Sequence, residues 1–220
     1  MQKVDLRLYA LLDPARAGGR TLPDLARALV SGGATILQLR DKNGSTRQMV
    51  ESARAIKGAV ADSGVPLLIN DRVDVALAAG ADGVHVGWED MSVEDARRLL
   101  GPDAIIGLSI KNSGQVARAP FALLDYACIG GVFVTGSKDN PDPPIGTDGL
   151  RKLAAEVRAR APALPVGAIA GIDASNAASV IQAGVEGIAV ISALSLARDP
   201  AAAARELRRI VDTSLAQVPA

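Results

Sequence analysis

Residues 65–90 read VPLLINDRVDVALAAGADGVHVGWED, and this stretch decides the predicted fold. It opens on an apolar run at 65–71, continues through a helical pattern at 72–80, and reaches a second short apolar run at 83–87. Two short apolar runs separated by a helix indicate a strand–helix–strand unit, which pairs its strands in parallel.

The same alternation continues in both directions along the chain. Apolar runs bounded by Gly, Asp, Asn or Pro occur at 6–13, 34–41, 65–71, 83–87, 105–109, 126–133, 165–171 and 187–193. Further helical patterns with cap residues occupy 21–33, 45–64, 92–101, 147–161, 173–184 and 199–216. The eight strand candidates predict an α/β protein, a (β/α)8 TIM barrel formed by residues 1–220 as a single domain. A doubly wound open sheet is the alternative, but eight evenly repeated units favour closure.

The composition fits this fold and argues against several classes of protein. Of the 220 residues, 49% are apolar and 2% aromatic, so the core must consist of aliphatic side chains, as buried parallel strands prefer. The net charge is zero, which together with the few aromatic residues argues against nucleic-acid binding. The sequence shows no signal peptide and no membrane helix, so a cytoplasmic protein is expected. The oligomeric state stays open, a homo-oligomer included.

The strand at 34–41 ends in polar residues that face the predicted mouth of the barrel. Gln38, Arg40 and Lys42 alternate, so they share one face while the chain stays extended. Leu37 and Leu39 point the other way, toward the helices. Buried cations are costly without an anionic partner, and this pair of cations suits phosphate or pyrophosphate. The alternative is a salt bridge to neighbouring acids.

Carboxylates follow the next two strands. Asn70 and Asp71 end the run at 65–71, and Glu89 and Asp90 follow the run at 83–87. Since the carboxyl ends of adjacent parallel strands meet at the mouth, Asp71 and Asp90 form a plausible Mg²⁺ site. The alternative is that each caps the helix that follows it.

The remaining strands end in candidate anion-binding groups, namely Ser109, Thr135, Ser137, Lys138, Gly171 and Ser192. Gly171 permits close backbone approach, and Ser192 opens a predicted short extra helix whose N–H groups suit a phosphate. One half of the mouth therefore suits a metal-bound pyrophosphate and the other half a monophosphate. This division predicts a reaction that joins two phosphorylated small molecules or displaces pyrophosphate.

The order and spacing of these motifs resemble the thiamine-phosphate synthase family over nearly the whole chain. The matching stretches are QLRDK, INDRVDVALAAGADGVHVGWED, IGLS, GGVFVTGSK and GIAVISA. The resemblance implies a barrel enzyme that couples a pyrimidine methyl pyrophosphate to a thiazole ethyl phosphate with Mg²⁺. It implies that the pyrimidine pyrophosphate contacts Gln38, Leu39, Arg40, Asp41, Lys42, Asn70, Ser109 and Lys138, and the thiazole phosphate Thr135, Gly136, Ser137, Gly171, Ile191 and Ser192. Asp71 and Asp90 match the metal carboxylates.

The resemblance also implies a dissociative mechanism. Pyrophosphate departs from a pyrimidine-stabilised carbocation, which the thiazole nitrogen captures, so Arg40, Ser109 and Lys138 act on the substrate and leaving group rather than as protein nucleophiles. The chain departs from the family pattern at Trp88, Gly131, Ser137 and Ala170, where the family usually has Gln, Pro, Thr and Gly. None of these departures removes a charged residue.

Three alternatives remain on the sequence alone. A thiazole tautomerase of the same fold typically has a histidine where this chain has Gly131 and lacks the second carboxylate, Asp90. A non-catalytic thiamine-pathway ligand-binding paralogue would bind both substrates without turnover. An aldolase-like barrel would need a lysine such as Lys42 or Lys138 with a lowered pKa, which neighbouring phosphate opposes.

Two further residues are assigned structural roles. His85, the single histidine of the chain, sits mid-strand and is predicted to be a structural histidine, with orientation of a mouth residue as the alternative. Cys128, the single cysteine, lies in an apolar run and is expected in the core.

Overall fold

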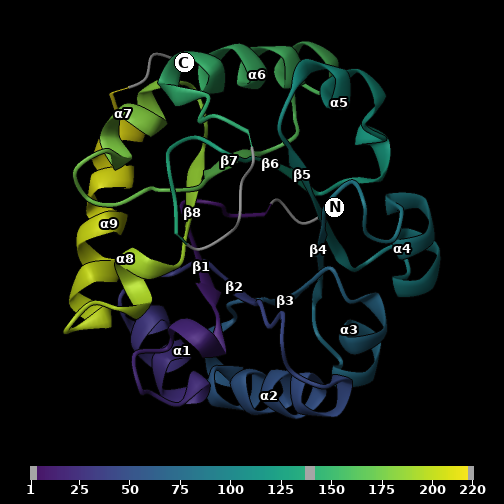
Figure 1. The fold of residues 1–220 in the computed structure, drawn as a ribbon, viewed down its shortest axis with the longest axis vertical. Coiled ribbons are helices and arrows are strands. Elements are labelled where there is room, and N and C mark those ends of the chain that lie inside the picture. Colours follow the sequence, from purple (N-terminus) through teal and green to yellow (C-terminus); the bar gives the residue numbers. More distant parts are fainter. Residues whose placement is uncertain (1–3, 137–141, 218–220) are drawn as a thin grey trace.

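The computed structural model describes residues 4–136 and 142–217, and in these residues eight parallel strands close into a barrel in chain order (Figure 1). The strands are β1 (Leu8–Leu12), β2 (Ile36–Leu39), β3 (Leu67–Asn70), β4 (Gly83–Val86), β5 (Ile105–Ile110), β6 (Tyr126–Ile129), β7 (Val166–Ile169) and β8 (Gly187–Val190). Each falls within or overlaps one of the eight predicted runs. The predicted (β/α)8 barrel is therefore confirmed, and the open sheet is excluded because β1 pairs with β8.

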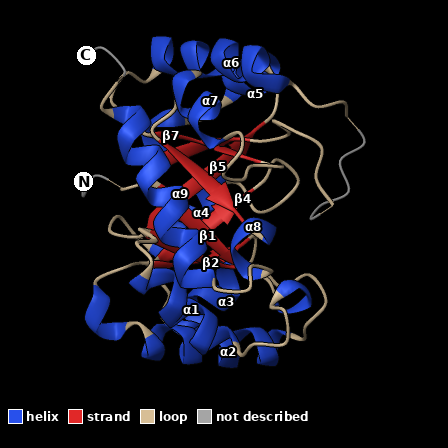
Figure 2. Cartoon of the chain, turned by 90° about the vertical axis from the view of Figure 1, so that its left-hand side faces the viewer, coloured by secondary structure: helices blue, strands red, loops and turns tan. Residues whose placement is uncertain are grey.

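Helices surround the strands, as the side view in Figure 2 shows. They are α1 (Leu22–Ser31), α2 (Thr46–Ala59), α3 (Val73–Ala79), α4 (Val93–Leu100), α5 (Ser113–Arg118), α6 (Gly146–Arg160), α7 (Ala177–Gln182), α8 (Ser192–Ser195) and α9 (Pro200–Leu215). The 3₁₀ turns Pro14–Arg16, Ala61–Ser63 and Phe121–Leu123 complete the chain. Six or more residues of helix follow every strand except β8, where the predicted short helix α8 precedes α9. Among the described helices, none is both long and apolar enough to cross a membrane.

Alternation along the strands divides the core into two layers. Outward side chains such as Leu37, Leu39 and Val84 pack with the helices in the larger layer. Inward side chains, among them Tyr9, Leu11 and Ile36, fill the barrel itself. The two layers explain why the strands are buried on both sides and carry so few polar residues.

One glycine makes room for a large ring inside the barrel. A Cβ atom on Gly107 of β5 would lie 2.0 Å from Cζ of Tyr126, which faces it from β6. Tyr126 is fully buried, so its ring could not move aside toward solvent. Gly107 therefore makes room for the ring of Tyr126 inside the barrel.

The opposite end of the barrel from the mouth carries a repeated hydrogen bond, which we call the basal ring. Its residues are Thr35, Asp82, Asp125 and Glu186, each directly before an even-numbered strand. Their side chains accept the backbone N–H groups at the start of the preceding odd strand, from Leu8 at 3.1 Å, and from Leu67, Ile106 and Val166 at 2.8 Å each. The ring joins the strands in pairs, one to two, three to four, five to six and seven to eight.

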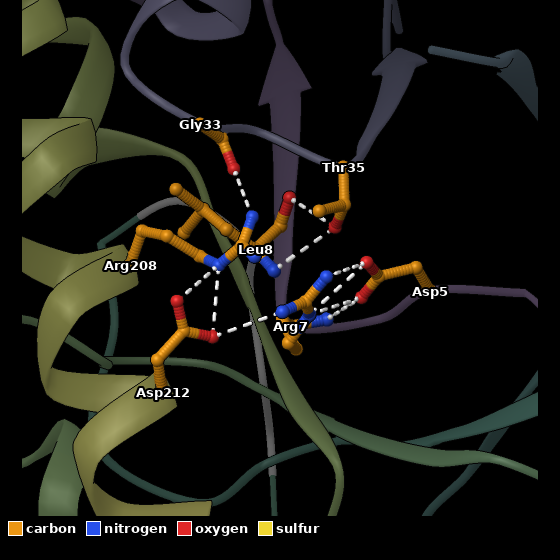
Figure 3. Close-up of polar contacts among 7 residues, drawn as sticks. All are labelled: Asp5, Arg7, Leu8, Gly33, Thr35, Arg208 and Asp212. Carbon is orange, nitrogen blue, oxygen red and sulfur yellow. Dashed lines mark hydrogen bonds and ion pairs between the residues drawn. The ribbon is translucent and has the colours of Figure 1, made fainter. Parts of the chain in front are cut away.

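Three of these side chains also pair with a cation from the preceding even helix. Lys57 of α2 lies 2.9 Å from Asp82, Arg97 of α4 2.6 Å from Asp125, and Arg158 of α6 2.5 Å from Glu186. Beside Thr35, the cations are Arg7, directly before β1, and Arg208 of α9 (Figure 3). There Arg208 of α9 donates to the carbonyl of Gly33 at 3.0 Å and lies 2.9 Å from Asp212, which Arg7 reaches at 3.3 Å.

Candidate active site at the mouth of the barrel

A cavity opens at the carboxyl ends of the strands, and every strand contributes to its wall. Its lining residues include Tyr9, Leu11, Gln38, Arg40, Asn70, His85, Ser109, Lys111, Cys128, Gly130, Gly131, Thr135, Ile169, Ala170, Gly171, Ile191 and Ser192. Eight of the residues predicted for substrate binding are in this set: Gln38, Arg40, Asn70, Ser109, Thr135, Gly171, Ile191 and Ser192. The predicted mouth is thus a single cavity, and both halves of the barrel contribute residues to its wall.

The alternation predicted for strand β2 is present. Gln38 points into the barrel and is 2% exposed, whereas Leu39 is buried in the outer layer against the helices. The side chain of Leu39 therefore faces away from the cavity, and Leu39 is not among the described residues that line it. The carboxylate of Asp41 accepts the N–H groups of Asn43 and Gly44 at 3.0 and 2.8 Å, so it shapes the loop before α2.

Both cations at the end of β2 have an acidic neighbour. Arg40 lies 2.6 Å from Asp13, which follows β1 and is 5% exposed, and Lys42 forms an ion pair with Asp71. The salt-bridge alternative is therefore present in the structure. Both cations remain able to bind an anion. A guanidinium has five N–H donors, and rearranging the half-exposed ion pair of Lys42 costs little free energy. Asp13 was not identified from the sequence.

The two carboxylates predicted to hold metal do not cap helices. The cap residue of α3 is Arg72, without a side-chain hydrogen bond, and α4 is capped by Ser92, whose hydroxyl accepts the N–H of Asp95 at 3.1 Å. Asp71 instead accepts from Asn70 Nδ2 at 2.6 Å, and Asp90 accepts the N–H of Gly87 at 2.8 Å. The helix-cap alternative is wrong for both residues.

The backbone of Asp71 is held in a conformation that turns its side chain toward the mouth. Its φ is 62°, a left-handed value that is uncommon for residues other than glycine, although Asp tolerates it better than most. The N–H of Asp71 donates to the carbonyl of His85 on β4 at 2.8 Å. A contact to the neighbouring strand thus offsets a backbone cost of order 1–3 kcal/mol, a pattern typical of functional sites.

The carboxyl groups of Asp71 and Asp90 influence each other. Partial burial raises the pKa of Asp90, and the neighbouring carboxyl group of Asp71 raises it further, while the N–H of Gly87 and the Lys42 ammonium act in the opposite sense. Within residues 4–136 and 142–217, no group of three or more His, Cys, Asp or Glu side chains is placed to hold a metal ion. A pair of carboxylates fits Mg²⁺ nevertheless, because this ion commonly takes one or two carboxylates and fills its shell with water and phosphate oxygens.

The other half of the cavity consists mainly of backbone. A Cβ atom on Gly171 would lie 2.5 Å from the carbonyl of Val134, so the chain after β7 packs directly on the chain after β6. Ala170 has a φ of 97°, a region that favours glycine, and this is one of the positions where the sequence departs from the family pattern. Ile191 and Ser192 open α8 beside them. Ser137 and Lys138 lie outside the described residues.

Gly136 and Trp88 are not among the residues that line the cavity in the described part of the chain. The carbonyl of Gly136 accepts a hydrogen bond from Arg16, in the turn after β1. Trp88 packs against the outer core, with the guanidinium of Arg118 5.4 Å from its ring centroid. The substitution at Trp88 therefore lies beside the mouth rather than in it.

A polar chain inside the barrel was largely missed by the sequence reasoning. Tyr9 and Tyr126, the two tyrosines of the protein, join hydroxyls at 2.9 Å, and His85 bridges Tyr126 and Ser109 at 2.8 and 2.9 Å. His85 is thus a structural histidine that also contacts a mouth residue, so both roles considered for it apply. The available signal was a tyrosine in each of two buried strands, since a buried phenol needs a partner.

The barrel and its polar mouth cavity define a (β/α)8-barrel enzyme that acts on small molecules. The chain belongs to the thiamine monophosphate synthase family, whose sequence model matches residues 8–194. It is 55% identical over 98% of both chains to a thiamine-phosphate synthase of Agrobacterium fabrum, and 47% identical to one of Albidiferax ferrireducens, over 94% of this chain and 92% of the relative. A solved thiamine phosphate pyrophosphorylase from Pyrococcus furiosus superposes with a TM-score of 0.84 at 38% identity, covering 98% of this chain and all of that one. The protein is accordingly a transferase of thiamine biosynthesis.

Proposed function

We propose that the protein couples 4-amino-2-methyl-5-(diphosphooxymethyl)pyrimidine to a thiazole ethyl phosphate, giving thiamine phosphate and pyrophosphate. The observation that carries this proposal is the mutual placement of Asp71 and Asp90 beside Lys42, next to Asn70, which lines the cavity together with Arg40. Paired carboxylates next to cations suit a metal-bound pyrophosphate, which is the leaving group of this reaction.

The two substrates would divide the cavity between them. Gln38, Arg40, Lys42, Asn70 and Ser109, on strands β2 to β5 and the loops after them, are assigned to the pyrimidine pyrophosphate. Thr135, Gly171, Ile191 and Ser192, after strands β6 to β8, are assigned to the thiazole phosphate. The close backbone packing at Gly171 and the start of α8 support this assignment, because exposed N–H groups at such turns bind phosphate.

Asp71 and Asp90 would hold the Mg²⁺. Once bound, the ion neutralises charge on the pyrophosphate oxygens. The protein prepares this site by fixing Asp71 through Asn70 Nδ2 and the backbone of β4, and Asp90 through the N–H of Gly87. Burial and the neighbouring carboxyl group of Asp71 raise the pKa of Asp90, so a further cation beside the pair would be favoured.

In the proposed reaction the bond between the pyrimidine methylene carbon and the pyrophosphate oxygen breaks, and a bond from the thiazole nitrogen to that carbon forms. Arg40 and Lys42 would stabilise the negative charge that grows on the departing oxygen. The nitrogen supplies its lone pair directly, so no protein side chain needs to act as nucleophile or base. The cavity contributes by holding the two substrates in register.

The direct test is to incubate the purified protein with both phosphorylated substrates and Mg²⁺, and to follow thiamine phosphate and pyrophosphate together. We expect equal amounts of both products, and no product when either substrate is omitted. Tight binding of both substrates without product would instead identify a binding paralogue. Interconversion of thiazole tautomers without coupling would identify a tautomerase.

A further inference from the structure

The floor of the cavity is crossed by one unbroken chain of hydrogen bonds. The side-chain amide nitrogen of Gln38 donates to the hydroxyl of Tyr9, which lies 2.9 Å from the hydroxyl of Tyr126. Tyr126 lies 2.8 Å from His85 Nδ1, and His85 Nε2 lies 2.9 Å from Oγ of Ser109. The chain begins at a buried amide on β2 and ends at a residue of the cavity wall on β5.

One continuous direction is available to this chain. With the Gln38 amide as donor, the Tyr9 hydroxyl can give its proton to Tyr126. Tyr126 can in turn donate to His85 Nδ1, which is then the unprotonated ring nitrogen. In this direction a neutral imidazole carries its proton on Nε2 and donates it to Ser109.

We propose that Gln38, Tyr9, Tyr126 and His85 form a directional relay that holds Ser109 with its hydroxyl proton facing the cavity, as a donor to the bound substrate. Since the serine oxygen already accepts from His85, its own proton is directed at an acceptor atom of the ligand. This inference rests on the proposed coupling in one respect, namely that the acceptor belongs to the pyrimidine pyrophosphate. Tyr9, Tyr126 and His85 are positioning residues in this scheme, since they act through Ser109.

The surroundings keep the relay in place and its two phenols protonated. The His85 and Tyr126 rings stack with centroids 5.5 Å apart, and Tyr9 meets Tyr126 edge-on at 5.8 Å. Burial raises the pKa of both tyrosines well above the usual value, so both phenols keep the protons that the relay needs. Gly107 provides the space for the Tyr126 ring.

The single histidine of the chain makes the relay directly observable. Nitrogen-15 spectra of the labelled protein contain one imidazole, and protonated and unprotonated ring nitrogens resonate far apart. We expect Nε2 protonated and Nδ1 unprotonated in the wild type. In Gln38→Glu at a pH where the new carboxylate is ionised, the first residue can only accept, so the chain should reverse and Nδ1 should become protonated. An unprotonated Nδ1 in that variant, or a protonated one in the wild type, would overturn the proposal.

Kinetics test whether the relay acts through Ser109. Tyr126→Phe removes one hydroxyl and should lower kcat/KM about tenfold, the cost of leaving a buried polar group without its partner. The same substitution in a Ser109→Ala background should have no further effect, because the group that it positions is gone. Multiplicative losses in the double variant would show that Tyr126 acts independently of Ser109 and would reject the relay.

Tyr9→Phe provides a second variant that breaks the chain one bond further from His85. It should lower kcat/KM less than Tyr126→Phe does, and an equal or larger loss would contradict a relay that runs through Tyr126. If the wild-type protein shows no coupling at all, the proposed function fails, and the nitrogen-15 spectra of wild type and Gln38→Glu still decide the relay on their own.

Discussion

The two ends of the barrel use the same residue types in opposite ways. At the base, Asp82, Asp125 and Glu186 each meet a backbone N–H group and a cation, so their charges are balanced where they stand. At the mouth, Asp71 and Asp90 lie beside each other, and the pKa of Asp90 is raised. Each carboxylate of the base thus has its own cation, whereas the two neighbouring carboxylates of the mouth share Lys42.

Neutralising either mouth carboxylate should have the largest effect, and it tests the difference between the two ends most directly. Asp71→Asn and Asp90→Asn should each lower kcat/KM by about 100-fold or more, because several kcal/mol of charge stabilisation depend on the metal. The free energy of unfolding should stay nearly unchanged, since neither residue caps a helix. Steady-state kinetics and urea denaturation of the same preparations measure both quantities.

Glu89 offers a matched control for these variants, because it is an exposed acid next to Asp90. Glu89→Gln changes the net charge by the same amount and should leave kcat/KM within about twofold. An equal loss in Glu89→Gln would mean that the general negative field, rather than the paired carboxylates, matters at the mouth.

Removing a carboxylate at the base should instead lower stability and leave activity nearly unchanged. Asp125→Ala leaves the buried guanidinium of Arg97 without its carboxylate and Ile106 without an acceptor, so we expect a loss of about 2–3 kcal/mol in stability. Tm should fall by roughly 5–10 °C, while kcat/KM per folded molecule stays close to wild type. Asp148→Ala, which removes an almost fully exposed partner of Arg151, is the control and should change Tm by little.

A smaller effect at the mouth is the dependence of protein stability on pH that Asp90 causes. The pKa of Asp90 is raised in the folded protein above its ordinary value of 3.8, so ionisation of Asp90 opposes folding. This penalty is absent below the unfolded pKa and complete above the folded one. In metal-free buffer, Asp90→Asn should therefore gain stability over the wild type as pH rises from about 4, by a modest amount because Asp90 is exposed.

Thermal denaturation across pH 3–8, with and without Mg²⁺, measures this dependence of stability on pH. Added Mg²⁺ should stabilise the wild type near neutral pH and have little effect on Asp90→Asn. A wild type that is equally stable with and without a large excess of Mg²⁺ would argue against metal binding by the pair.

The smallest expected effect concerns the residue next to the mouth. Trp88→Gln removes the contact with Arg118 and should cost about 0.5–1 kcal/mol, without changing kcat/KM. Circular dichroism melting and the coupling assay measure the two quantities. A change in KM for the pyrimidine substrate would place Trp88 in the binding surface.

Periodicity in the sequence was enough to predict the barrel. Eight apolar runs that alternate with helical patterns favoured parallel strands and a closed barrel, and the structure confirms the closed order. Helix α5 was missed because it has six residues, includes Gly114, and buries only Val116, so its pattern is too short to detect. The short helix α8 was predicted because a phosphate-binding role was considered for Ser192.

Only part of the mouth could be predicted, because several of its contacts join residues that are far apart in the sequence. The positions of Gln38, Arg40 and Asn70 follow from strand alternation, which is local. The partners of Arg40 and His85 are not local: Asp13 lies 27 residues from Arg40, and Tyr126 lies 41 residues from His85. Whether Asp71 caps a helix depends on the hydrogen bond from its N–H to the carbonyl of His85 on β4. The sequence around Asp71 does not reveal this long-range bond.

The basal ring also bears on the order in which the chain can assemble. Three of its cations are on α2, α4 and α6, so those three strand pairs can be fastened as soon as each stretch has left the ribosome. The first pair also has Arg208 and Asp212 of α9 beside it. Because β1 pairs directly with β8, the seam between the beginning and the end of the barrel closes last, and until β8 has been synthesised the nascent chain exposes an edge of β1.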